Sequence, residues 1–139
     1  MARLLRKIIL STKAPAPSPV YSQAVSFNNL IYLSGSLGVN RDTNKLVQGG
    51  ATSEAKQALE NIKNILESGG SKIDNVIKAT VYLKDLNDYA QVNEVYQQYF
   101  TKNPPARTAF QVGNLPLNAS VEIEVIAAVG DVETTHTKM

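Results

Sequence analysis

Cysteine and tryptophan are absent from the 139 residues of this chain, and histidine occurs once, as His136 in a polar tail. The lack of cysteine excludes disulfides and thiolate nucleophiles. Together with the scarcity of histidine, it also removes the usual nitrogen and sulfur ligands of zinc and iron. We therefore expect neither a metal nor another cofactor. Any chemistry must use arginine, lysine, acidic residues, tyrosine, serine or backbone groups.

Long apolar runs and dense clusters of one charge are also missing. No apolar run approaches the roughly 18 residues that a membrane-spanning helix needs. The N-terminus, MARLLRKIIL, is interrupted at Lys7 and has no small-residue cleavage site after it. We expect a cytoplasmic protein without a membrane partner, with an organelle as the remaining alternative. Because the formal net charge is only +2 and basic residues are scattered, the sequence argues against nucleic acid as a partner.

The composition itself is that of an ordinary globular protein. The chain has 43% hydrophobic and 19% charged residues, in a length that suits one domain, residues 1–139. Two segments show the apolar spacing of amphipathic helices. The first covers 52–68 and should end at a pair of glycines. The second should begin after a cap at Asp85 or Asn87 and end before Asn103 and two prolines. Its apolar face has four members: Tyr89, Val92, Tyr96 and Phe100.

Strand patterns occupy most of the remaining sequence. Residues 24–27 and 30–35 flank Asn28 and Asn29, a pair that tolerates the positive φ of a tight turn, and should form a hairpin. Residues 76–85 alternate with period two, which indicates a half-buried strand. One face of that strand should carry Ile77, Ala79, Val81 and Leu83. Further strands are predicted at 4–10, 107–112 and 120–129, and residues 36–51 should be loop or short strand.

This order of elements predicts an α+β domain in which both helices pack on one face of a mixed sheet. The last strand indicates that the other face needs cover as well. There Ile126 and Ala128 alternate with the core-facing residues and share a side with Glu122 and Glu124. Two helices can cover only one face of such a sheet. A second apolar face therefore indicates that another copy of the chain covers it in a homo-oligomer.

A few polar residues occupy positions in the predicted strands and helices from which they could bind a ligand or transfer a proton. Arg107 follows a proline turn at the start of a strand, and is either a surface arginine or a bidentate ligand for a carboxylate or phosphate. Glu122 and Glu124 share a strand face, where they can pair with lysines or one of them can handle a proton. Asn93 lies on the apolar helix face and needs partners, which are either buried backbone groups or a site. Tyr21 adds a phenol to this set.

Five segments, taken together and in order, carry a resemblance. They are YSQAV at 21–25, YLSGSLGVN at 32–40, VIKATVYLKDLNDYAQVNEVY at 76–96, PPARTAFQVGNLP at 104–116 and VEIEVIAAV at 121–129. These segments resemble the Rid family (also called YjgF/YER/UK), and within it the RidA branch. The resemblance implies homotrimers of a chorismate-mutase-like α+β fold with pockets at the subunit interfaces. It also implies 2-iminobutanoate/2-iminopropanoate deaminase activity, the hydrolysis of imino and enamine acids such as 2-aminoacrylate to 2-oxo acids and ammonia.

The resemblance also implies roles for individual residues. Arg107 would hold the substrate carboxylate, Glu122 would orient the catalytic water, and Tyr21 would be the pocket tyrosine. Three further residues would line the substrate site: Ser34, Gly35 and Asn93. Two alternatives stay open. One is an endoribonuclease that inhibits translation, for which the chain lacks a histidine pair. The other is a chaperone-like or ligand-binding protein that uses the same pocket without turnover.

Overall fold

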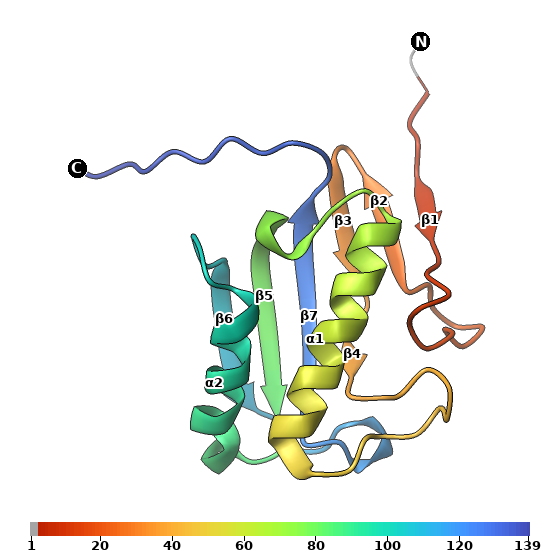
Figure 1. The fold of residues 1–139 in the computed structure, drawn as a ribbon. Coiled ribbons are helices and arrows are strands. Elements are labelled where there is room, and N and C mark those ends of the chain that lie inside the picture. Colours follow the sequence, from red (N-terminus) through yellow and green to blue (C-terminus); the bar gives the residue numbers. More distant parts are fainter. Residues whose placement is uncertain (1–2) are drawn as a thin grey trace.

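The computed structural model describes residues 3–139, which form a sheet with helices on one side (Figure 1). The helices are α1 (Gly50–Ser68) and α2 (Tyr89–Tyr99). The strands are β1 (Lys7–Ile9), β2 (Ala24–Phe27), β3 (Leu30–Leu33), β4 (Ser36–Leu37), β5 (Val76–Leu83), β6 (Ala106–Gln111) and β7 (Val121–Ala128). Short 3₁₀ turns at Ile73–Asn75, Leu86–Asp88 and Pro116–Asn118 complete the order. Across residues 3–139 no helix is long and apolar enough to cross a membrane.

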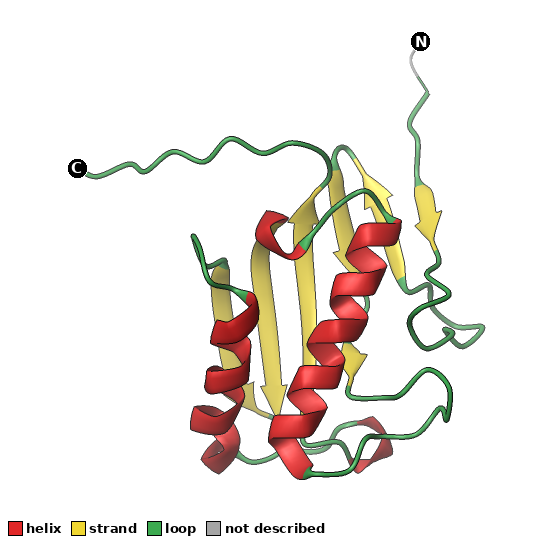
Figure 2. Cartoon of the chain, in the orientation of Figure 1, coloured by secondary structure: helices red, strands yellow, loops and turns green. Residues whose placement is uncertain are grey.

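The seven strands of residues 3–139 form one mixed sheet with the order β1-β2-β3-β7-β5-β6, and β4 pairs with β7 beside this path. β5 and β6 are parallel, and the other neighbours are antiparallel. Within the described residues, both α-helices cover the same face of this sheet (Figure 2). The predicted α+β class, with a mixed sheet and two helices on one face, is confirmed.

The helix α1 forms where the apolar spacing predicts it, beginning two residues earlier than expected. Gly70 ends it in the left-handed conformation, with φ of 78°, and the N–H of Ser71 donates to the carbonyl of Leu66 at 2.9 Å. This is the usual end of a helix at glycine. The apolar face is fully buried against the sheet: Ala55, Ala58, Leu59, Ile62, Ile65 and Leu66.

The start of α2 differs from the prediction. The side chain of Asp85 accepts from the N–H of Asn87 at 2.9 Å, so it caps the short turn Leu86–Asp88 from which α2 continues. The helix ends at Tyr99, before Asn103 as predicted, although Phe100 of the predicted apolar face follows it as the cap. The tight turn between β2 and β3 is confirmed, with Asn28 and Asn29 both at positive φ.

One predicted strand face is wrong in part. Ile77 was expected beside Ala79 on the core side of β5, but its side chain is 48% exposed and Val76 is buried instead. The register against β7 shifts between Val76 and Lys78, so that Ile77 is an extra residue in β5. A bulge of this kind reverses the side to which the preceding residues point. From Ala79 onward the predicted alternation holds.

Buried polar side chains fix the segment after β3 against α1. The amide of Asn61 donates to the carbonyls of Leu37 at 3.2 Å and Val39 at 2.9 Å. The buried carboxylate of Glu54 accepts from the N–H of Ser120 at 2.8 Å. At Gly38 a side chain would collide with the backbone of Glu54, so only glycine permits this approach of strand and helix. These contacts hold the segment 34–39 against α1.

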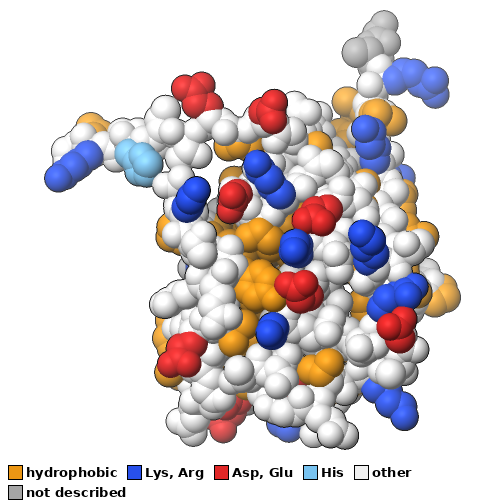
Figure 3. Space-filling view, viewed as in Figure 1, with side chains coloured by type: hydrophobic (Ala, Val, Ile, Leu, Met, Phe, Trp, Pro, Cys, Tyr) orange, Lys and Arg blue, Asp and Glu red, His pale blue; other side chains and the backbone are white. Residues whose placement is uncertain are grey.

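The face of the sheet opposite the helices is exposed in the single chain. Strand register places Ile8, Val25, Tyr32 and Ile126 in one row across β1, β2, β3 and β7. Ile8 is 60% and Tyr32 is 43% exposed. By contrast, the helix side shows acidic and basic side chains interspersed (Figure 3). The sheet is therefore apolar on both faces, as the sequence predicts.

Candidate functional site

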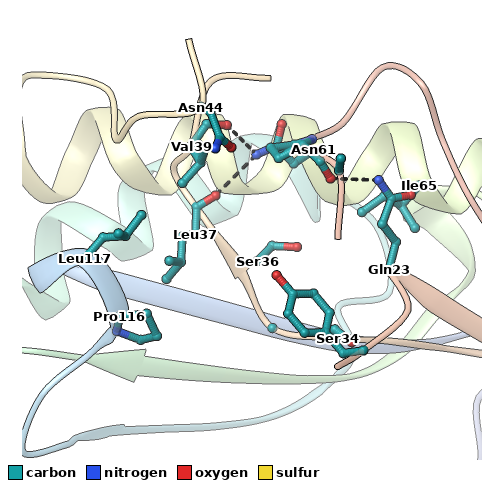
Figure 4. A pocket seen from close by; sticks show the side chains of 14 residues that line it. Gln23, Ser34, Ser36, Leu37, Val39, Asn44, Asn61, Ile65, Pro116 and Leu117 are labelled. Carbon is teal, nitrogen blue, oxygen red and sulfur yellow. Dashed lines mark hydrogen bonds between the residues drawn. The ribbon is translucent and has the colours of Figure 1, made fainter. Parts of the chain in front are cut away.

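Three predicted site residues line one cavity of about 340 Å³ (Figure 4). Tyr21 comes from the connector before β2, and Ser34 and Gly35 follow β3. Residues of α1 and of the turn at Pro116–Asn118 close other sides of the cavity. Tyr21 is 52% exposed and stands at the cavity with its ring accessible to a ligand.

The connector that carries Tyr21 is held by the buried side chain of Gln23. Its amide oxygen accepts from the N–H of Ser11 at 2.7 Å, and its amide nitrogen donates to the carbonyl of Pro15 at 2.8 Å. The hydroxyl of Ser34 donates to the carbonyl of Ser22 at 2.6 Å. Because that proton is already used, Ser34 can offer a ligand only the lone pairs of its oxygen.

Glu122 is not among the residues that line this cavity, but its carboxylate lies directly against one of them, Gly35. A side chain at position 35 would overlap the carboxylate, so any residue larger than glycine there would displace the carboxylate from this place. Burial raises the pKa of Glu122, and the neighbouring Glu124 raises it further. A carboxyl group whose pKa moves up toward neutrality is better suited to exchange protons with a substrate or water.

Glu124 has a different environment on the same sheet face. The hydroxyl of Tyr82 donates to its Oε1 at 2.5 Å. This hydrogen bond raises the pKa of Tyr82 to about 12, with burial and the charge of Glu124 as further causes. The sequence left two roles open for the glutamates, pairing with lysines or handling a proton. Glu124 is the one that is paired, and its partner is Tyr82 instead of a lysine. Glu122 is left as the acidic group beside the cavity.

Arg107 lies in the edge strand β6 and turns toward α2. Its Nη1 donates to Oδ1 of Asn93 at 2.8 Å, and its Nη2 donates to the hydroxyl of Tyr89 at 3.1 Å. The guanidinium carbon lies 4.7 Å from the ring centroid of Tyr96 and 5.6 Å from that of Tyr89. The structure thus brings Arg107 and Asn93 together. It also shows that Asn93 serves the arginine rather than buried backbone.

Tyr89 is the residue of this group that sequence reasoning missed. It was assigned to the apolar face of α2, whereas its ring is 41% exposed and its hydroxyl contacts Arg107. The amide of Asn93 and the guanidinium of Arg107 lower the pKa of Tyr89. A signal existed in the sequence, because Tyr89 and Asn93 are four residues apart and hence neighbours on a helix surface.

The site residues form two clusters. We call Tyr89, Asn93, Tyr96 and Arg107 the arginine cluster. We call Tyr21, Ser34, Gly35 and Glu122 the glutamate cluster. Arg107 pairs with Ala79 of β5, a core residue, so it points to the helix side of the sheet. Glu122 pairs with Tyr82, which points to the other side. One chain therefore places Arg107 and Glu122 on opposite faces.

Comparison with known proteins agrees with this geometry and with the motifs. Residues 11–129 match the family described as Endoribonuclease L-PSP. The chain is 52% identical to the 2-iminobutanoate/2-iminopropanoate deaminase of Bos taurus over 134 residues, which covers 96% of this chain and 98% of that protein. The chain belongs to the Rid (YjgF) family. The resemblance inferred from the motifs is confirmed.

Solved Rid structures share the fold as well. RidA from the Antarctic bacterium Psychrobacter sp. PAMC 21119 is 42% identical with a TM-score of 0.85, covering 88% of this chain and 99% of that one. TdcF of E. coli, solved with bound serine, is 35% identical with a TM-score of 0.84, covering 89% and 99%. The Rid fold of this chain therefore rests on sequence and structure together.

Proposed function

We propose that this Rid protein is a hydrolytic deaminase that converts 2-imino and enamine acids, such as 2-iminobutanoate and 2-aminoacrylate, to 2-oxo acids and ammonia. The observation that carries the proposal is the 52% identity to a 2-iminobutanoate/2-iminopropanoate deaminase over almost the whole of both chains. The residues available suit this chemistry. An imine carbon is already electrophilic, so its hydrolysis needs a positioned substrate, an oriented water and a proton relay.

Arg107 is assigned to the substrate carboxylate. A guanidinium has five N–H donors in a planar fork, and the contacts to Asn93 and Tyr89 use two of them. Three donors remain, and a bidentate carboxylate needs two. Because the guanidinium is already held by hydrogen bonds and by the ring of Tyr96, little of its freedom is left to lose on binding.

Glu122 is assigned to the water. As the water oxygen bonds to C2 of the protonated imine, one water proton passes to Glu122 and a carbinolamine forms. Glu122 then returns the proton to the nitrogen and the C–N bond breaks. Nitrogen leaves as ammonia, and loss of the hydroxyl proton gives the 2-oxo group and, with ammonia, ammonium. The raised pKa of Glu122 suits both directions of transfer. Tyr21, Ser34 and Gly35 are assigned to lining this part of the pocket.

We further propose that the pocket forms between copies of the chain in a homotrimer. Arg107 and Glu122 lie on opposite faces of one sheet, so a substrate that contacts both requires a second copy. The exposed apolar row on the outer sheet face gives such a copy a surface to bury. We predict a trimer mass by sedimentation or light scattering at micromolar concentration. A mass near that of the 15.1 kDa monomer would overturn the shared pocket.

Two other activities are weaker candidates. An endoribonuclease needs a general acid and base around a phosphodiester. Here the single histidine, His136, lies in the C-terminal tail beside Asn103, at 3.0 Å, and not in either cluster. A binding protein without turnover would have no need for a carboxyl group with a raised pKa beside the cavity. The single-domain organisation and the cytoplasmic location stay predictions.

The deciding experiment generates 2-aminoacrylate or 2-iminobutanoate in situ with an amino-acid dehydratase. If the proposal holds, the purified protein speeds the appearance of the 2-oxo acid and leaves RNA intact in a parallel reaction. RNA cleavage that follows the protein through every purification step, without faster imine hydrolysis, would favour the endoribonuclease instead.

A further inference from the structure

The start of α2 presents a hydroxyl group beside a cation. Tyr89 is the first residue of α2, and its oxygen accepts a hydrogen bond from Nη2 of Arg107 at 3.1 Å. The same phenol is influenced by the amide of Asn93, which lowers its pKa. With the oxygen facing these donors, the hydroxyl hydrogen is directed away from them. Because Tyr89 is 41% exposed, its hydroxyl is free to donate to a ligand that binds next to the guanidinium.

The other two tyrosines of α2 show that this arrangement is particular to Tyr89. The hydroxyl of Tyr99 donates to the carboxylate of Glu60 in α1 at 2.6 Å and is therefore occupied within the chain. The hydroxyl of Tyr96 is buried and lacks a partner among the described residues. Of the three, only Tyr89 in the described structure combines an accessible hydroxyl with a contact to Arg107.

We propose that Tyr89 is a substrate-binding residue: with Arg107 it forms a carboxylate subsite, in which the guanidinium supplies two N–H donors and the phenol supplies its O–H. This inference rests on the assignment of Arg107 to the substrate carboxylate. A carboxylate offers about four lone-pair positions, so it accepts from a guanidinium fork and a hydroxyl at once. The contact of Arg107 with the phenol oxygen makes its O–H a stronger donor, which favours an anion over a neutral ligand.

The subsite predicts a preference for the shape of the ligand as well as for its charge. A planar carboxylate that accepts from the guanidinium with both oxygens still has a free lone pair on the oxygen nearer Tyr89, whereas an amide at the same place presents an N–H₂ group to one of these donors. We expect 2-oxo acids to bind and their amides to bind much more weakly. Removing only the phenol oxygen should then weaken carboxylates and leave amides unchanged.

The test compares Tyr89→Phe with Tyr99→Phe, the same chemical change in the same helix at a hydroxyl that does not contact Arg107. Calorimetry measures the Kd of 2-oxobutanoate, the product carboxylate, and of 2-oxobutanamide for both variants and the unchanged protein. We expect Tyr89→Phe to raise the Kd of 2-oxobutanoate about tenfold, in line with one charge-assisted hydrogen bond at a partly exposed site. The Kd of 2-oxobutanamide should not change, and Tyr99→Phe should bind both ligands as the unchanged protein does.

Steady-state kinetics provides a second measurement. A purely structural role of Tyr89 would not raise KM while leaving kcat unchanged. In Tyr89→Phe, KM for the imino acid should rise about tenfold with kcat within about twofold, because the contact is the same in ground and transition states. The inference is overturned if 2-oxobutanoate binds Tyr89→Phe normally, if Tyr99→Phe causes the same loss, or if the unchanged protein does not bind 2-oxobutanoate. A protein that binds 2-oxobutanoate through Tyr89 but hydrolyses no imine would overturn the proposed function and leave the subsite standing.

Discussion

The arginine cluster and the glutamate cluster are positioned by different means. Arg107 is held by side chains of one helix, through two hydrogen bonds and an aromatic ring. Glu122 has no such side-chain brace in the described structure, and its carboxylate packs against Gly35, in space that a larger residue at position 35 would occupy. The orientation of the Arg107 guanidinium is therefore fixed before a ligand binds, whereas the pKa of Glu122 is raised by burial and by the nearby charge of Glu124.

This difference fits the two tasks. A group that captures an anion gains from a fixed orientation, because less freedom is lost on binding. A group that exchanges protons gains from a shifted pKa, which burial provides and a salt bridge would remove. The two clusters also lie on opposite faces of the sheet, so each chain would contribute a binding half to one pocket and a proton-transfer half to another.

The largest expected effect is at Glu122. Glu122→Gln keeps the size of the side chain but cannot take a proton from water, so we expect kcat to fall about a thousandfold, within the range for general acid–base catalysis. The Kd of 2-oxobutanoate should change little, because the arginine cluster is intact. A variant that retains a tenth of the activity would exclude Glu122 as the base.

The same substitution has a predicted pH signature. Since the folded-state pKa of Glu122 is raised, its ionisation costs stability as pH rises from the unfolded-state value through the folded-state value. Glu122→Gln should therefore be the more heat-stable protein at neutral pH, and the difference in Tm should vanish at pH below the ordinary pKa of glutamate. A stability difference that does not depend on pH would contradict the raised pKa.

The second effect is at Arg107. A hydrogen bond to a charged group is worth roughly 1.5 to 3 kcal/mol, so Arg107→Ala should lower kcat/KM about a hundredfold. Arg107→Lys keeps the charge without the planar fork and should lie between alanine and arginine. Kinetics and oligomer mass are measured on the same preparations. Intact trimers of Arg107→Ala with normal turnover would remove Arg107 from the mechanism.

Mixing these two defective variants tests whether the clusters meet across a subunit boundary. In random mixed trimers, a pocket is intact when both of its functional residues are unchanged. The chain that supplies Arg107 must then be the Glu122→Gln variant, and the chain that supplies Glu122 must be the Arg107→Ala variant. This happens in about one quarter of pockets in a symmetric ring. Co-expressed Arg107→Ala and Glu122→Gln should thus recover about a quarter of the wild-type activity. No recovery, in trimers shown to be mixed, would mean that both residues of a pocket come from one chain.

Much of this arrangement could be predicted from the sequence where the pattern is local. The apolar spacing of α1 and the alternation of β7 fixed which side chains face the core, and Asn28 with Asn29 gave the hairpin. The motif around Arg107 and the pair of glutamates pointed to the site residues. These signals involve neighbours in the chain, where the geometry of a helix or strand leaves few alternatives.

The remaining features depend on contacts between distant parts of the chain. The bulge at Ile77 appears only when β5 pairs with β7, about fifty residues later in the sequence. The strand β6 has no clear alternation of apolar and polar residues, so the face to which Arg107 points could not be read before its parallel pairing with β5 was known. Tyr89 looked apolar for the same reason, because its partner is an arginine of that strand.

The smallest expected effect concerns Tyr96, where ring and hydroxyl have separable roles. Its ring lies under the guanidinium of Arg107 and 4.4 Å from the ring of Phe100, whereas its buried hydroxyl lacks a partner among the described residues. Tyr96→Phe keeps the ring and removes a polar group that is costly to bury. The free energy of unfolding, from urea titration at fixed protein concentration, should rise by up to about 1 kcal/mol.

The matched control is again Tyr99→Phe, which loses a hydrogen bond to Glu60 and should lower the same free energy by roughly 1 kcal/mol. Since phenylalanine also attracts a cation to its face, Tyr96→Phe should hold Arg107 in place and keep kcat/KM within about twofold. A tenfold loss of kcat/KM, or a lower free energy of unfolding, would show that the Tyr96 hydroxyl makes a favourable interaction. The Tyr96 hydroxyl would then have a partner in the assembled protein, either a group of a neighbouring copy or the substrate itself. The hydroxyl, as well as the ring, of Tyr96 would in that case belong to the binding site.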